Sequence, residues 1–190
     1  QGQSYINNID ADKLNYGVSN NIFTPTCDFS RIKEVDVIII CVPTPLNKNQ
    51  EPNLEYIVST GNLIAPFLKK NQLIILESTS YPGTTSEILK PIIENNRFKS
   101  GKNIFIAYSP EREDPGNSEF DNRNTPKVVG GDELRAKKLA CAVYDEVFVK
   151  TIPVSSMEVA EAVKLTENIF RSVNIAMINE LKIIYTKMGI

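Results

Sequence analysis

Histidine and tryptophan are absent from this 190-residue sequence, and cysteine occurs only three times. Without histidine, the commonest general base and the commonest metal ligand are missing. Chemistry must therefore rest on lysine, carboxylates, cysteine, threonine or a cofactor, and we expect no metal site. The cysteines are Cys27, Cys41 and Cys141, and no two of them form a CxxC pair. This spacing argues against a disulfide scaffold and makes the reducing cytoplasm the expected compartment.

A strong charge of one sign and a long apolar segment are also missing. The 21 Lys and Arg residues against 23 Asp and Glu leave a formal charge of −2, which argues against a nucleic-acid partner. The longest apolar run, Val37–Val42, is far too short to cross a bilayer, so we expect no membrane partner. The sequence begins at Gln1 without an initiator methionine or a signal-type stretch, and we expect it to be part of a longer protein.

Short apolar runs alternate with helix-like stretches through most of the sequence. The expected strands are Val37–Val42, Leu73–Glu77, Ile104–Tyr108, Lys127–Val129 and Val147–Ile152. The expected helices are Asn53–Lys69, Thr84–Asn95 and Glu133–Asp145. The first strand is read as covered on both faces, and Gly130-Gly131 as a turn. This alternation predicts an α/β fold, namely a partial Rossmann-like, doubly wound parallel sheet over residues 1–152.

The last forty residues have a different pattern. Ser155-Ser156-Met157-Glu158 fits a capping box, and neither Gly nor Pro follows until Gly189. A helix over residues 156–188 would be roughly 50 Å long. It carries a wide apolar arc, beside a narrow polar stripe that contains Glu161, Lys164, Asn168 and Arg171. We expect residues 153–190 to begin a central helical domain and to form a homodimer through this helix.

Polar side chains follow the expected strands at the edge where parallel sheets bind ligands. Pro43 and Thr44 come after the first strand, and Ser78 and Thr79 come after the second. Hydroxyls at this edge suit hydrogen bonds to a ribose, a nicotinamide or a water. The alternative is that the first loop is only a stiff turn and the second only a helix-capping turn.

The loop SPEREDPGN (109–117) contains four successive charges and no long apolar side chain. Glu111 could act as an acid or base, and Arg112 could pair with a phosphate or carboxylate, although a solvated acidic loop is the alternative. Lys164 and Asn168 lie one helical turn apart and could stabilise an oxyanion, or simply form a solvated face. Cys41 and Cys141 are expected to be buried structural thiols.

Five segments together resemble the UDP-glucose/GDP-mannose dehydrogenase family. They are DVIIICVPTPL (36–46), LESTSYPGTT (76–85), SPEREDPGN (109–117), PKVVGG (126–131) and EVAEAVKLTENIFRSVNIAMINEL (158–181). Their order and spacing fit as well, so the resemblance covers nearly the whole chain. The second and third segments are most similar to the branch that oxidises UDP-N-acetylhexosamines, UDP-N-acetylglucosamine above all.

The resemblance implies an enzyme that oxidises the C6 alcohol of a UDP-sugar to a carboxylate with two NAD, through a cysteine thioester. It assigns catalytic roles to four residues: Thr79 helps to hold the catalytic water, Glu111 acts as acid or base, Lys164 stabilises developing oxyanions and Asn168 positions the substrate. It implies that four residues line the NAD site: Pro43, Thr44, Ser78 and Thr79. It implies that four residues bind the substrate: Glu111, Arg112, Lys164 and Asn168.

The sequence also departs from the family pattern. It contains no GxGxxG loop and no acidic ribose-binding residue after one, and it stops before the Gly-rich motif of the nucleophilic cysteine. Pro115 stands where some members have a second carboxylate. We therefore expect this chain to be inactive by itself. Two alternatives remain open: an oxidoreductase similar to 6-phosphogluconate and β-hydroxyacid dehydrogenases, and a non-catalytic dimerisation module.

Overall fold

The computed structural model describes residues 10–95, 97–111 and 125–190, and it separates into two compact units, residues 1–30 and 31–190. The described part of the first unit contains one helix, α1 (Ala11–Ser19). Asp10 caps this helix, because its carboxylate accepts hydrogen bonds from the backbone N–H groups of Asp12 and Lys13. No side chain of α1 is buried.

The second unit is built on a five-stranded sheet with the order β1-β2-β3-β4-β5. The strands are β1 (Val37–Ile40), β2 (Leu73–Leu76), β3 (Phe105–Tyr108), β4 (Lys127–Gly131) and β5 (Thr151–Pro153). The predicted α/β fold with a doubly wound parallel sheet is confirmed, and one pairing departs from it, since β4 runs antiparallel to β3. The first three strands are mutually parallel, and β5 is parallel to β4.

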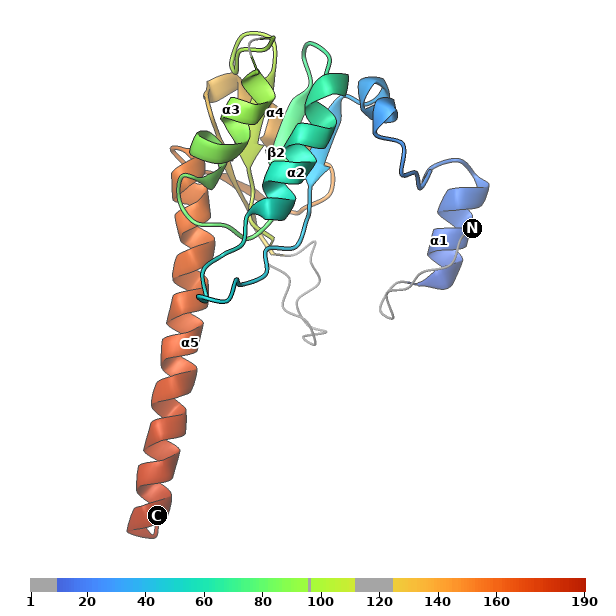
Figure 1. Ribbon diagram of the computed structural model, residues 1–190. Coiled ribbons are helices and arrows are strands. Elements are labelled where there is room, and N and C mark those ends of the chain that lie inside the picture. The colour runs from blue at the N-terminus through green and yellow to red at the C-terminus, as the bar shows by residue number, and fades with distance from the viewer. Residues whose placement is uncertain (1–9, 96, 112–124) are drawn as a thin grey trace. The chain divides into compact units, whose positions relative to one another are not determined.

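Helices cover both faces of this sheet, as Figure 1 shows. The helical segments are η1 (Phe29–Glu34), α2 (Glu55–Ile64), η2 (Ala65–Phe67), η3 (Thr84–Leu89), α3 (Lys90–Glu94), α4 (Leu134–Asp145) and α5 (Met157–Met188). The expected cap at Thr84 is wrong. Gly83 occupies that position with φ of +99°, and Thr84 already belongs to the widened turns of η3.

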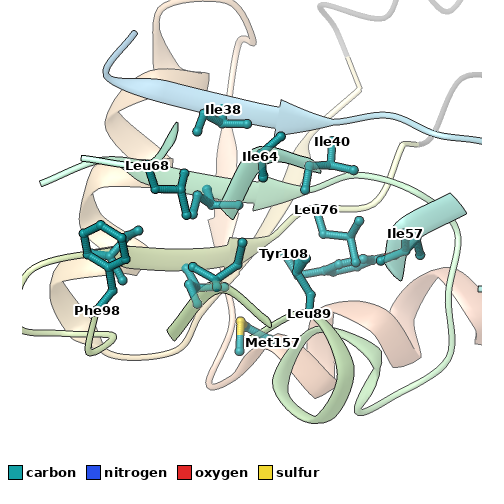
Figure 2. Packing of buried hydrophobic residues seen from close by; sticks show 14 of the residues in the cluster. Ile38, Ile40, Ile57, Ile64, Leu68, Leu76, Leu89, Phe98, Tyr108 and Met157 are labelled. Atoms are coloured by element: carbon teal, nitrogen blue, oxygen red, sulfur yellow. The ribbon is translucent and has the colours of Figure 1, made fainter. Parts of the chain in front are cut away.

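Alternate residues of the strands pack on the two faces, as the twofold period of a strand requires. On one face, Ile74, Leu76 and Tyr108 pack with α2, η3, α3 and the start of α5, and Figure 2 shows part of this cluster. On the other face, Ile75 and Phe105 pack against α4. The sheet is therefore wound on both sides, and its central strands are fully buried.

The first strand is less covered than its sequence predicts. β1 ends at Ile40, and the side chain of Ile39 is 44% exposed. β1 is the edge strand of the sheet. The expectation that both faces are buried is wrong for this strand, because an uninterrupted apolar run does not reveal which faces have a partner.

Gly130 and Gly131 lie inside β4, so the expected turn at these residues is wrong. A Cβ at Gly130 would lie 2.3 Å from the carbonyl oxygen of Ser156, and one at Gly131 would lie 2.4 Å from the amide nitrogen of Lys137. The two glycines therefore allow the starts of α5 and α4 to approach opposite faces of the strand.

The long C-terminal helix is confirmed, and α5 has 32 residues. Ser156 is its N-cap and accepts a hydrogen bond from the backbone N–H of Val159, so Ser155 is not the capping residue. Only Met157, Ala160 and Glu161 are buried; most later side chains are exposed, and Figure 1 shows the helix continuing well past the sheet. A domain boundary near residue 152 stays a prediction.

Candidate functional site

The carboxyl ends of β1, β2 and β3 lie at one edge of the sheet because these strands are parallel. Since β4 is antiparallel to β3, it begins at that same edge, with Lys127. The candidate site is this carboxyl edge and the loops that follow the three strands. Its position agrees with the rule that open α/β sheets bind ligands beyond their strand ends.

Ser78 links the loop after β2 to the end of β1 and the loop that follows it through hydrogen bonds. Its hydroxyl accepts a hydrogen bond of 2.9 Å from the Val42 amide and donates one of 3.4 Å to the carbonyl of Ile40. The Tyr108 hydroxyl donates to the Ser78 carbonyl at 3.3 Å. The Ser78 hydroxyl therefore serves the backbone here, and its proposed contact with a cofactor stays a prediction.

Thr44 is the residue of the first loop whose chemistry best fits a bound ligand. Its hydroxyl oxygen is buried and has no hydrogen-bond partner within the described part of the chain. A buried hydroxyl without a partner is costly, so a polar group that reaches this edge would relieve that cost. Pro43 and Thr79 are both exposed, and both follow the carboxyl ends of parallel strands. The residues present therefore fit a polar cofactor at this edge.

Glu111 contacts a residue that the sequence analysis did not select. The carboxylate of Glu111 lies 3.1 Å from the ammonium of Lys127, and that ammonium lies 3.3 Å from the carboxylate of Glu77. The Lys127 side chain is only 3% exposed, and its ammonium is 5.1 Å from the ring centres of both Tyr144 and Phe148. These rings attract the cation through their negative faces.

The Glu77 carboxylate also has two hydrogen-bond donors beside it. The Tyr144 hydroxyl donates a short hydrogen bond to it, and the Cys41 thiol lies 3.6 Å from its other oxygen. Burial, and next the Glu77 carboxylate, raise the pKa of Cys41 to about 11. Burial also raises the pKa of Tyr144. The expectation that Cys41 is buried is wrong, because the residue as a whole is exposed, although its thiol lies against Glu77. A thiol with this pKa is protonated and therefore unreactive at neutral pH.

Glu161 joins α5 to the loop after β2. Its carboxylate accepts hydrogen bonds from the amides of Gly83 (2.6 Å) and Thr85 (2.9 Å), and from the hydroxyls of Thr85 (2.6 Å) and Ser80 (3.4 Å). Its side chain is fully buried, although the sequence analysis placed it on the narrow polar stripe of the helix. Desolvation raises its pKa, against the lowering effect of these hydrogen bonds.

The contacts of Glu161 determine where Lys164 lies. α5 starts beside Gly130 and reaches the loop after β2 at Glu161, so it runs toward the carboxyl edge. Lys164 follows about 4.5 Å further along the helix axis, on the same side. Lys164 is half-buried and Asn168 is exposed. Arg112 lies outside the described residues.

The sequence offered a signal for each of the residues that were missed. Lys127 is a charged residue at the start of a run of valines and glycines, a position that predicts burial at a strand end. Glu161 is four residues after Met157, which is buried at the start of the same helix. What sequence alone does not reveal is the partner, because the donors to Glu161 come from residues 80–85.

Two negative findings concern the described residues only. No group of three or more metal-ligating side chains occurs among them. None of the helices in this part of the chain is long and apolar enough to cross a membrane.

The sheet, its ligand-binding edge and the helix that passes it define a Rossmann-like nucleotide-binding domain followed by a long helix. Residues 1–148 match the family model "UDP-glucose/GDP-mannose dehydrogenase family, NAD binding domain". Residues 158–190 match the model of the central domain of the same family. The chain therefore belongs to the UDP-glucose/GDP-mannose dehydrogenase family, whose N-terminal domain binds NAD.

Individual relatives agree with this assignment. The chain is 38% identical over 167 residues to UDP-N-acetyl-D-glucosamine 6-dehydrogenase of Pseudomonas aeruginosa, covering 87% of this chain and 40% of the relative. It is 40% identical over 161 residues to UDP-N-acetyl-D-mannosamine dehydrogenase of Methanococcus aeolicus, covering 83% and 36%. A solved UDP-D-ManNAc dehydrogenase from Pyrococcus horikoshii superposes with a TM-score of 0.92 at 30% identity, covering 100% and 46%. The chain thus spans less than half the length of each.

Proposed function

We propose that the full-length protein carrying this chain oxidises C6 of a UDP-N-acetylhexosamine to a uronic acid, with two NAD per sugar. The observation that carries the proposal is the family match, which extends over both the NAD-binding and the central segment of the chain. The similarity to relatives named for UDP-N-acetylglucosamine and UDP-N-acetylmannosamine supports an N-acetylated sugar. The nucleophilic cysteine of the thioester step lies outside this chain.

Four residues of the chain have proposed catalytic roles. Lys164 stabilises the negative charge that develops on the sugar oxygen, since an ammonium held beside an oxyanion does so without reorganisation. Asn168, one turn further on the helix, positions the same group. Thr79 orients the water that attacks the thioester, and Glu111 accepts its proton. Arg112 is proposed to pair with an anionic group of the substrate.

Bound NAD would supply the hydride acceptor for oxidation of the sugar carbon. Pro43, Thr44, Ser78 and Thr79 are proposed to hold it at the carboxyl edge. The buried, unpaired hydroxyl of Thr44 supports this assignment among the described residues, because it offers a polar group a contact that the chain itself does not supply. We place the protein in the cytoplasm, on the ground of its scattered, unpaired cysteines.

The substrate assay uses the full-length protein with NAD and a panel of UDP-N-acetylglucosamine, UDP-N-acetylmannosamine, UDP-glucose and 6-phosphogluconate. We expect NADH with at least one of the two UDP-N-acetylhexosamines and a higher kcat/KM for it than for UDP-glucose. NADH from 6-phosphogluconate alone would favour the first alternative function. No NADH from any of the four would favour the dimerisation module.

We also propose that α5 begins a central helical domain and forms a homodimer interface. Val173, Met177 and Ile184 are 60%, 51% and 47% exposed on this helix, which is a larger apolar surface than a monomeric helix usually leaves in water. A second copy presenting the same face would cover it.

Light scattering after size exclusion tests the homodimer. We expect a dimer for the unaltered chain and a monomer for Val173→Glu or Met177→Glu, because a buried unpaired carboxylate opposes association. Leu134→Glu is the matched control: it also charges an exposed apolar residue (62% exposed) but lies on α4, and should stay dimeric. A dimer in all variants would contradict the interface.

A further inference from the structure

Lys127 forms the most deeply buried ion pair in the described part of the second unit. Its ammonium lies between two carboxylates that come from separate loops, Glu77 after β2 and Glu111 after β3. The rings of Tyr144, in α4, and of Phe148, just after α4, also lie against the ammonium. The side chain is 3% exposed, whereas that of Glu111 is 45% exposed. The pair thus connects a buried cation with a carboxylate that reaches the surface of the site.

Packing alone does not account for this arrangement. Withdrawing an ammonium from water is costly, and an apolar side chain at the first residue of β4 would fill the same space without that cost. The cation is nevertheless held by several groups at once. Glu77, which pairs with this ammonium, itself accepts a hydrogen bond from the Tyr144 hydroxyl. The result is an ammonium in one defined place, with Glu111 as its outward partner.

We propose that Lys127 is a positioning residue, which holds the Glu111 carboxylate in the orientation needed to accept a proton from the attacking water. The proposal rests on the proposed function, because that function assigns the acid/base role to Glu111. Lys127 touches no reacting atom. It acts through Glu111 alone, by restricting the rotation of that side chain.

The ordering of a proton acceptor has a measurable effect on rate. A displacement of about 1 Å from the reactive geometry can cost up to about 100-fold in turnover. We therefore expect Lys127→Met in the full-length protein to lower kcat by about 10- to 100-fold. We expect Lys127→Arg to retain most of the turnover, since a guanidinium can bridge the same two carboxylates.

A double-mutant cycle separates positioning from general stability. If Lys127 acts through Glu111, Lys127→Met should lower kcat by less than about twofold further in a Glu111→Gln background. A purely structural role predicts that the two losses multiply. Multiplying losses, or unchanged turnover in Lys127→Met, would overturn the proposal. If Lys127→Met does not fold, Tyr144→Phe replaces it in the same cycle, because it removes the hydroxyl that fixes Glu77 but keeps the ring.

Lys90→Met is the matched control. Lys90 also forms a partly buried ion pair, 2.8 Å from Asp132, but Asp132 lies beside Ile106, at the other end of β4 from Lys127. This variant should lower the melting temperature and leave kcat unchanged. The unaltered protein separates the two levels of the account: without NADH formation from either UDP-N-acetylhexosamine the proposed function fails, whereas an active enzyme with multiplying losses contradicts only the role of Lys127.

Discussion

Replacing Lys164 by alanine in the full-length protein is expected to lower kcat by about 100- to 1000-fold, the usual cost of removing one group that stabilises an oxyanion. The helix carrying Lys164 is held against the loop after β2 by the buried carboxylate of Glu161, about one turn before Lys164. KM for the UDP-sugar should change little, because the negative charge appears only during the reaction.

Steady-state kinetics with NAD and the preferred UDP-sugar measure this effect. Lys138→Ala is a suitable control, since Lys138 is exposed on α4 and has no proposed role. A Lys164→Ala enzyme whose kcat stays within about threefold of the unaltered enzyme would contradict the oxyanion role, because no group that supplies such stabilisation is so dispensable.

Replacing Glu161 by alanine destabilises the chain by about 3 kcal/mol or more, because it leaves the buried amides of Gly83 and Thr85 without an acceptor. For a chain of this length, that loss lowers the melting temperature by about 10 °C. The same change frees the start of α5 from the loop after β2, so the proposed site should also lose its geometry.

Thermal unfolding followed by circular dichroism measures the stability of the 190-residue chain. Lys182→Ala is the control, because Lys182 lies on the same helix, is exposed and is on the opposite side from Val173. It should change the melting temperature by no more than about 2 °C. Equal melting temperatures for Glu161→Ala and Lys182→Ala would mean that the four hydrogen bonds to Glu161 contribute nothing to the fold.

Much of the fold follows from local sequence pattern. Leu73–Leu76 and Phe105–Tyr108 are short, wholly apolar runs bounded by turns. Runs of this length fit a buried strand or a short helix, and both are strands in the structure. α5 begins after a capping serine and continues until Gly189, whose φ of +80° favours glycine. These features depend on residues that are neighbours in the sequence, so the sequence predicts them.

The features that were missed depend on contacts between distant segments. The direction of β4 relative to β3 is encoded by no local pattern of the sequence. Gly130 resembles a turn residue in sequence, whereas its function is to admit the backbone of Ser156. Glu161 and Lys127 look like surface charges until the donors and carboxylates from other loops are in place.

The candidate site was predictable in part for the same reason. The family-like segments indicated Thr79, Glu111 and Lys164 individually, and the structure places their loops and helix at one edge of the sheet. What the sequence did not contain is the pair of buried groups that connects them, Lys127 to Glu111 and Glu161 to the loop of Thr79. Residues that position a site through contacts with distant segments are therefore harder to predict from sequence than residues that line it.

The stoichiometry of NADH formation tests the central claim most directly. Full-length protein is incubated with a limiting, weighed amount of the preferred UDP-N-acetylhexosamine and excess NAD, and NADH is measured by absorbance when the reaction is complete. The account predicts about two NADH per sugar, together with loss of activity after alkylation of cysteine, because an alcohol is oxidised to a carboxylate through a thioester. About one NADH per sugar, with activity insensitive to alkylation, would contradict it.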